Sequence, residues 1–144
     1  MKLQIDYGYK TYDIEDSEGN VVGSIRFNPS DMGMVGRWNE AQKRIEEMLS
    51  GNINTPEEVY KADCFVKDQL DYIFAAPVAE VLFAGQSAVS IRADGSMLLE
   101  SVLEALAPII QDAQQAAGKA SAQRMANHTA KYQNTTRGMA PGQV

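Results

Sequence analysis

Two apolar helical patterns fill most of residues 70–110, and a break centred on Gly85 separates them. In each pattern an apolar residue recurs every three or four positions, which is the spacing of one face of an α-helix. Helices of this kind must bury their apolar faces against one another or against further elements. The stretch therefore predicts a packed helical core, and it contains no group of side chains suited to making or breaking bonds.

Capping residues mark where the two preceding helices should begin and end. Residues 32–49 carry apolar side chains at intervals of three and four, with charged residues elsewhere, which predicts an amphipathic helix. Gly51 is expected to end this helix in a left-handed conformation. The next helix should begin after Thr55, because this threonine can cap the first turn and Glu58 completes a capping box. It should end before Pro77.

The rest of the core pattern predicts one short helix and one long helix. Residues 77–83 should form the short helix, since a proline begins it and a glycine follows its end. Residues 86–95 are typical of a loop or a short extended connection. Met97 should begin the last core helix, and Pro108 inside that pattern implies a kink or a new helix start.

Two segments near the N-terminus alternate apolar and polar residues as β-strands do. Residues 3–14 alternate loosely, and residues 21–27 alternate more regularly. Between them lies a polar stretch whose Gly19-Asn20 pair tolerates positive backbone φ angles. The sequence therefore predicts an antiparallel hairpin with its turn at residues 17–20.

The charges divide the chain into two regions of opposite sign. Residues 1–112 hold nineteen acidic and nine basic side chains, a net charge of -10, whereas residues 113–144 hold four basic side chains and no acidic one. The two regions should attract each other, or the basic region should bind an acidic partner. The four bases are spread out and have no repeated aromatic neighbours, which disfavours nucleic-acid binding.

A hydrophobic share of 44% and a charged share of 22% in 144 residues fit one packed domain with an appended tail. The expected fold class is α+β and mainly α. An N-terminal β-hairpin and a bundle of about four helices should form a domain over residues 1–112. A flexible basic tail should follow over residues 113–144, helical to about Asn127 and extended or disordered from Thr129.

The inventory of reactive side chains argues against catalysis. His128 is the only histidine, which excludes a Ser-His-acid triad and a histidine metal cluster within one chain. Cys64 is the only cysteine, and we expect it to be a small, partly buried apolar residue rather than a reactive thiolate. No Walker loop or dinucleotide fingerprint occurs. We therefore expect a protein that is not an enzyme and that binds no cofactor and no metal.

The sequence also predicts where the protein works. No apolar run approaches the ~20 residues that a membrane-spanning helix needs. The first six residues lack the apolar core of a secretion signal. A single cysteine fits a reducing compartment. We therefore expect a cytoplasmic protein without membrane association.

The segment that joins the second strand to the first helix carries the candidate partner-binding residues. Asn28 should be extended because Pro29 follows it, and Ser30 or Asp31 can accept backbone N–H bonds as a helix cap. Adaptable apolar side chains gather directly after this corner. They are Met32, Met34, Val35 and Trp38. Core packing accounts for such a cluster, and the alternative is that part of it forms an exposed groove or patch for a helix of another protein.

Several short motifs within residues 20–112 point to one known family. They are F-N-P-S-D at 27–31, D-Y-I-F at 71–74, V-L-F-A-G at 81–85, and L-E followed by L-E-A-L-A-P-I-I within 99–110. In this order around an amphipathic helix, they resemble the small tail assembly chaperones of long-tailed, siphovirus-like phages and prophages of Gram-positive bacteria. The basic region after Ala113 has no counterpart in that resemblance.

The resemblance implies a non-catalytic, mainly helical protein of the host cytoplasm. Its partners would be the tape measure protein, which it would coat during tail building, and the tail tube protein, whose subunits it would recruit. It would leave before the virion is mature. In that family a longer product of translational frameshifting is common. Self-association stays open as well.

Two other functions remain open from the residues. One is a structural virion protein, such as a small tail, neck or head component, whose C-terminal arm becomes ordered on a neighbouring subunit. The other is a nucleic-acid-associated regulator that uses the four basic side chains of residues 113–144. Salt-dependent binding that disappears on truncation at Ala113 would identify the regulator.

Overall fold

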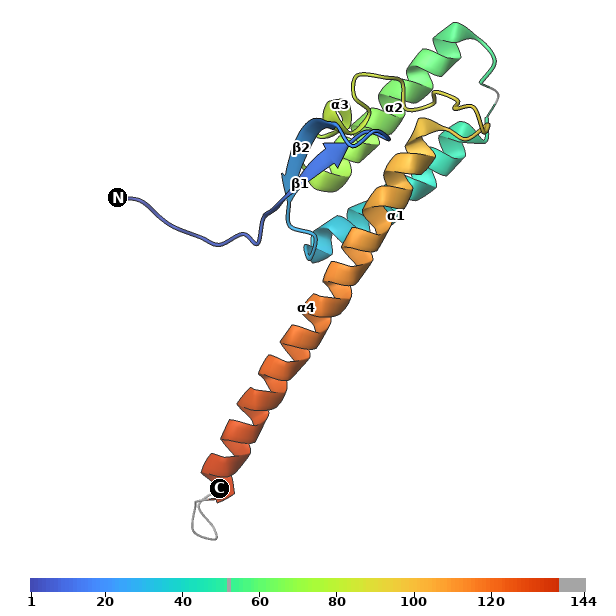
Figure 1. The fold of residues 1–144 in the computed structure, drawn as a ribbon. Helices are drawn as coiled ribbons and strands as arrows, with labels where there is room; N and C mark the ends of the chain where they lie inside the picture. The colour runs from blue at the N-terminus through green and yellow to red at the C-terminus, as the bar shows by residue number, and fades with distance from the viewer. Residues whose placement is uncertain (52, 138–144) are drawn as a thin grey trace.

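The computed structural model describes residues 1–51 and 53–137, with side chains described up to Ala130. In this part of the chain a two-stranded hairpin precedes four helices (Figure 1). The elements are β1 (Lys10–Glu15), β2 (Val21–Phe27), α1 (Met32–Leu49), α2 (Pro56–Phe74), α3 (Ala79–Leu82) and α4 (Leu98–Arg137). The predicted fold class, α+β and mainly α, is confirmed.

The hairpin pairs β1 with β2 in antiparallel fashion, from Lys10 opposite Phe27 up to a bulge near Glu15. The carboxylate of Asp16 organises the turn, because its Oδ1 accepts the backbone N–H groups of Glu18 and Asn20, each at 2.9 Å. The hydrogen bond from Asn20 contributes most to lowering the pKa of Asp16. Gly19 has a φ of 84°, as the turn prediction requires.

The predicted strand over residues 3–14 is too long by its first seven residues. The observed strand begins at Lys10, and residues 1–9 lie outside the sheet. Two features explain the correction. Gly8 has a φ of 72°, which interrupts extended backbone. On the partner strand, Phe27 is the last paired residue and Pro29 follows without an N–H to donate.

The helices α1 and α2 begin as their caps predict. Asp31 caps α1 with its Oδ1, which accepts the N–H of Gly33 at 2.9 Å. Thr55 and Glu58 form the predicted capping box at the start of α2. The expectation for Gly51 was wrong, since its φ is not positive. Instead Ser50 ends α1 in a right-handed conformation and donates its N–H to the carbonyl of Glu46.

The helix α4 runs from Leu98 to Arg137 as one element, so neither a new start at Pro108 nor an extended chain from Thr129 is observed up to Arg137. Pro108 has no N–H to donate to the carbonyl of Glu104. Both residues are exposed, so this carbonyl can bond water instead. Alanine, glutamine, lysine and arginine sustain the helix further on. Residues 138–144, the rest of the predicted tail, lie outside the described residues.

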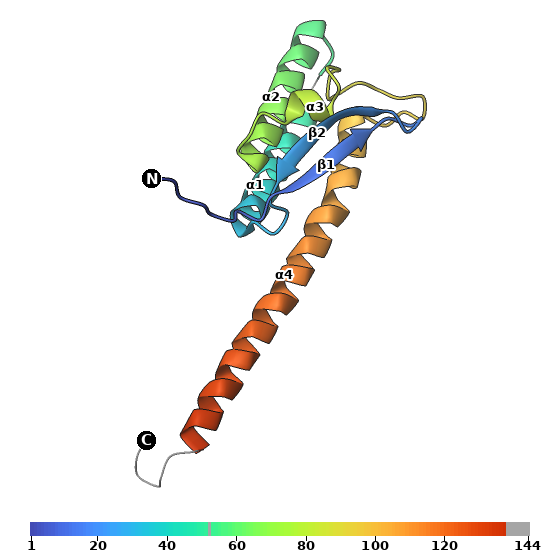
Figure 2. The ribbon, with the colours of Figure 1, turned by 60° about the vertical axis from the view of Figure 1, so that its left-hand side comes forward.

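The core lies where one face of the hairpin meets the helices (Figure 2). Phe27 stacks on Tyr12 with ring centroids 5.0 Å apart and meets the ring of Phe74 edge-on at 4.9 Å. The short helix α3 packs closely on β2, because a Cβ built on Gly23 would lie 2.6 Å from Cγ1 of Val81. Val78 is buried and Val81 is half-buried, which confirms the prediction that the short helix belongs to the core. The helix is shorter than the predicted 77–83, since it begins after Val78 and Pro77 lies outside it.

Carboxylates of α2 hold the segments that follow it. Asp71 Oδ1 accepts the N–H of Ala79 at 2.8 Å and so fixes the start of α3. Asp63 Oδ1 accepts the N–H of Ala88 at 2.8 Å, and its other oxygen lies 3.4 Å from the ammonium of Lys67. These bonds anchor the connection between α3 and α4. Across residues 1–51 and 53–137, no helix is both long and apolar enough to cross a membrane.

Candidate partner-binding surface

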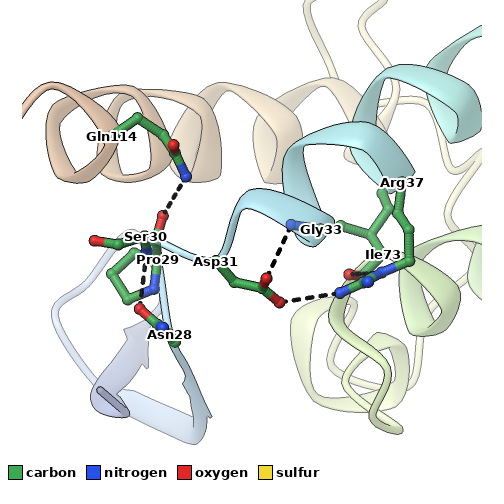
Figure 3. Close-up of polar contacts among 8 residues, drawn as sticks. All are labelled: Asn28, Pro29, Ser30, Asp31, Gly33, Arg37, Ile73 and Gln114. Atoms are coloured by element: carbon green, nitrogen blue, oxygen red, sulfur yellow. Dashed lines mark hydrogen bonds and ion pairs between the residues drawn. The ribbon is translucent and has the colours of Figure 1, made fainter. Parts of the chain in front are cut away.

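The corner between β2 and α1 is a network of backbone caps (Figure 3). Asn28 Oδ1 accepts the N–H of Ser30 at 2.9 Å, and Asp31 turns towards the first turn of α1. Pro29 is buried between them. The corner is therefore fixed by short local bonds that the F-N-P-S-D sequence supplies.

Arg37 connects this corner to the end of α2. Its Nε donates to the carbonyl oxygen of Ile73 at 2.9 Å, and its Nη2 lies 3.3 Å from Oδ2 of Asp31. The carbonyl of Ile73 is close to the point where α2 ends, at Ala75 in a left-handed conformation with a φ of 52°. One guanidinium thus joins the start of α1 to the last turn of α2 (Figure 3).

The same corner also holds α4. Gln114 Nε2 donates to the carbonyl oxygen of Pro29 at 3.2 Å, and Ser30 Oγ donates to the carbonyl oxygen of Ala113 at 3.4 Å. Both bonds join segments more than eighty residues apart in the sequence. The F-N-P-S-D segment therefore sets the position of α4 relative to α1 (Figure 3).

A groove of about 340 Å³ lies between α1 and α4 as a result. Its apolar lining is partly or fully buried and comes from Val35, Trp38, Ala107 and Ile110. Its polar lining consists of uncharged amides only, from Asn39, Gln111, Gln114 and Gln115. An apolar floor with an amide rim suits an amphipathic helix, which buries its apolar stripe and hydrogen-bonds at the edges.

The four predicted partner-binding residues separate into three environments. Val35 and Trp38 are half-buried and line this groove, which we call the α1–α4 groove. Met32 is 72% exposed on the first turn of α1. Met34 is 2% exposed and belongs to the core, so it presents no surface to a partner. The two glycines near them, Gly33 and Gly36, are exposed and approach no backbone of a neighbouring element.

Sequence reasoning missed the wall of the groove that α4 supplies. Ala107, Ile110, Gln111, Gln114 and Gln115 recur at intervals of one, three and four, so they share one side of a helix. This spacing was visible in the sequence. The pairing of that side with Trp38 was not, because it depends on the bonds from Gln114 and Ser30 across the corner.

Beyond Gln114 the helix α4 projects from the body, as both ribbon views show (Figures 1 and 2). Every side chain from Gly118 to Ala130 is exposed. The described charged side chains of this part of α4 are Lys119 and Arg124, both basic. Met125 is the one large apolar residue between Gly118 and Ala130, and it is 68% exposed. We call residues 115–137 the projecting half of α4.

The reactive side chains singled out in the sequence lie on separate elements of the described chain. No group of three or more His, Cys, Asp or Glu side chains there is placed to hold a metal ion. Cys64 is half-buried on α2, and His128 lies exposed on the projecting half of α4.

The Tyr72 hydroxyl donates to Glu40 at 2.8 Å, and this bond is the main cause that raises the pKa of Tyr72. It ties α2 to α1 at the surface.

No protein-family model matches this sequence, and comparisons with curated proteins and with solved structures find no match either. The functional inference therefore depends on the residues and the geometry of this chain.

Proposed function

We propose that this protein is a non-catalytic tail assembly chaperone that binds the tape measure protein of a long-tailed phage and helps to recruit tail tube subunits. The α1–α4 groove is the observation that carries the proposal. Its geometry depends on the F-N-P-S-D corner, which is also the first motif of the resemblance to this family. The motif thus has a structural task in building the surface that we propose binds the partner.

The chemistry of the groove fits a helical partner with an apolar stripe. Val35, Trp38 and Ala107 are half-buried and offer apolar surface, and the surrounding amides can donate or accept without adding charge. A tape measure protein is long and helical, and its apolar stripes would aggregate until tube subunits surround it. A helix laid in the groove would have one stripe covered.

Charge explains how the complex would stay dispersed in the host cytoplasm. Residues 1–112 carry a net charge of -10, so copies bound along one tape measure protein would repel further association. Many weak contacts along a repeated target give a high total affinity, while each contact remains reversible. Reversibility is required because tube subunits must later displace the chaperone.

Affinity capture after co-expression with the tape measure protein tests the proposal. Wild type should capture the tape measure protein and keep it in the soluble fraction. The double variant Asn39→Arg and Gln111→Arg should reduce capture at least ~10-fold, because two long charged side chains on the rim obstruct an apolar helix. Both positions are exposed, so the fold should be preserved.

The double variant Gln123→Arg and Asn127→Arg is the matched control, since it adds two arginines at exposed positions of α4 away from the groove. It should capture the tape measure protein as wild type does. Circular dichroism melts of all three proteins verify equal folding. Failure of the wild type to capture the tape measure protein, or equal capture by the rim variant, would contradict the proposal.

A structural virion protein is the second candidate, and the projecting half of α4 favours it. A basic helix that projects from the described body could dock on an adjacent acidic subunit of a particle. The two candidates differ in where the protein ends up. A structural protein is present in finished particles, whereas an assembly chaperone is absent from them. An assembly chaperone gene should also lie between those of the tail tube and tape measure proteins.

A further inference from the structure

The N-terminal arm, which we define as residues 1–9, carries a strand-like pattern without a strand partner in the described structure. Its odd-numbered residues are all large and apolar, and all are exposed. They are Met1, Leu3, Ile5, Tyr7 and Tyr9. The even-numbered residues are polar or glycine. Alternation of this kind is typical of a strand with one buried face, yet the arm extends away from the body in both views (Figures 1 and 2).

The end of the arm that joins β1 contacts residues at the end of β2. The guanidinium of Arg26 on β2 lies 4.6 Å from the ring centroid of Tyr9. A Cβ built on Gly8 would lie 3.2 Å from the side chain of Asn28, directly after β2. Asp6 Oδ1 accepts the N–H of Gly8 at 2.8 Å. These contacts direct the arm along the β2 side of the hairpin and not back over β1.

The outer edge of β1 could supply the strand partner that the arm lacks. The sheet has two strands, so in the described chain this edge pairs with no strand. A cleft of about 310 Å³ lies beside it, between β1 and α4. Its lining is mainly apolar and includes Tyr12, Ile14, Leu82, Val102, Leu106 and Ile109. An unpaired edge above an apolar cleft is a site for strand addition.

We infer that the N-terminal arm of a second copy of this chain adds to the outer edge of β1 as an antiparallel strand. The register that fits best places Leu3 opposite Ile14 and Ile5 opposite Tyr12. Residues that face each other across paired strands point to the same side of the sheet. Tyr12 and Ile14 face the cleft, so Leu3 and Ile5 enter it as well.

The same register places polar residues on the exposed side of β1. Lys2 comes opposite Glu15, which pairs opposite charges, and Gln4 comes opposite Asp13. A shift by one residue would point the apolar side chains of the arm to solvent. A shift of two residues in either direction fits less well. A shift of two residues one way places Asp6 opposite Asp13, and the other way places Ile5 opposite Lys10.

A parallel arrangement fits less well. With Leu3 opposite Tyr12 and Ile5 opposite Ile14, the next outward residue, Asp6, would lie beside Glu15. Like charges on neighbouring strands are destabilising.

Each copy carries both an arm and a free β1 edge, so two copies can exchange arms reciprocally in a closed, two-fold symmetric dimer. This inference does not rest on the proposed function.

Disulfide trapping between two differently tagged chains tests the pairing directly. Both chains carry Cys64→Ala. One adds Gln4→Cys and the other adds Asp13→Cys, which should be opposite neighbours on the exposed side. Paired residues on adjacent strands lie ~5 Å apart between Cα atoms, within disulfide range. Mixing and mild oxidation should give a disulfide-linked pair that contains both tags.

Gln4→Cys mixed with Ser24→Cys is the matched control. Ser24 is exposed and pairs with Asp13 from β2, so it is one strand further from the arm. That separation of ~10 Å exceeds disulfide range. The Gln4 and Asp13 pair should exceed the control at least ~10-fold, and equal yields would overturn the inference.

A single chain that carries Cys64→Ala, Gln4→Cys and Asp13→Cys tests whether the arm pairs with β1 of a second copy or with β1 of its own chain. We expect a disulfide between chains. A disulfide within monomers would mean that the arm folds back on its own β1, and it would overturn the inference.

Sedimentation equilibrium provides a readout without engineered cysteines. Wild type should have twice the mass of one chain, and Leu3→Ser with Ile5→Ser should be monomeric. This variant should still unfold cooperatively, because both residues are exposed within one chain. Gln4→Ser should remain dimeric. A monomeric wild type, or a dimer that survives the double substitution, would overturn the inference.

Discussion

The two halves of α4 belong to one helix but serve different purposes. Residues 98–114 place Leu99, Val102, Leu106 and Ile110 in the core. The same side of the helix continues through Ala113, Ala117 and Ala120 to Arg124, and none of these four side chains belongs to the core. The hydrogen bonds from Gln114 to Pro29 and from Ser30 to Ala113 lie at the change between the two halves.

Within this one helix, the first half stabilises the fold and the projecting half is free to bind a partner. The first half is helical because it buries an apolar stripe, whereas the second half is helical through the propensity of alanine, glutamine, lysine and arginine. Substitutions in the first half should therefore change the stability of the whole body. Substitutions in the projecting half should leave body stability unchanged and affect local helicity or partner binding.

The largest contrast is expected between Leu106→Ala and Met125→Ala. Leu106 is buried, so its truncation should lower the free energy of unfolding by about 2–5 kcal/mol. Met125 is exposed, so its truncation should change that free energy by less than about 0.5 kcal/mol. Urea unfolding followed by fluorescence of Trp38 measures both. A loss of similar size from the two variants would show that the projecting half also packs.

A smaller loss is expected when the guanidinium at the corner is removed. Arg37→Ala should lower the free energy of unfolding by about 1.5–3 kcal/mol, because the carbonyl of Ile73 and the carboxylate of Asp31 both lose a charged partner.

Arg44→Ala is the control for this change. Arg44 pairs with Glu40 in an exposed position, where an ion pair contributes about 0–1 kcal/mol. Chemical denaturation of both variants gives the comparison. Equal losses would show that Arg37 does not join α1 to α2 as the structure indicates.

Paired glycine substitutions distinguish the two halves of α4 by helix propensity alone. Ala105 and Ala120 are both exposed, one in each half. Ala105→Gly should lower the free energy of unfolding of the body by about 1 kcal/mol. Ala120→Gly should leave that value unchanged and instead lower helical circular dichroism before the main transition. A body transition that shifts equally in both variants would contradict two separable halves.

The smallest effect concerns the hairpin turn and depends on pH. Hydrogen bonds from the turn lower the pKa of Asp16 below 3.8, with the backbone N–H of Asn20 as the largest cause. The stabilisation is therefore present above pH 3.8 and is lost as the pH falls through the folded value. Asp16→Asn keeps an accepting oxygen but loses the charge. The stability difference between wild type and this variant should shrink on acidification, and a constant difference would contradict the assignment.

Local signals in the sequence predicted most elements of the body. Thr55 and Glu58 supply the cap of α2 within four residues, and the turn at Gly19 is set by its immediate neighbours. The start of α1 at Met32 follows from Asp31 in the same way. Such interactions involve residues close in sequence, so a pattern can reveal them.

Interactions between distant residues escaped prediction. The strand pattern of residues 3–9 is present, but a strand also needs a partner, and β2 ends opposite Lys10. The α1–α4 groove depends on bonds from Gln114 and Ser30 across the corner. The sequence indicated Val35 and Trp38 as candidate contacts, but it could not show that Met34 turns into the core or that α4 supplies the opposite wall.

The most direct test of the central proposal follows this chain through tail assembly. Affinity capture from infected or induced cells is combined with mass spectrometry of purified particles. The chaperone account predicts that the chain is captured with the tape measure protein during assembly and is absent from finished particles. Stoichiometric presence in particles, without capture of the tape measure protein, would contradict it and would identify a structural component of the virion.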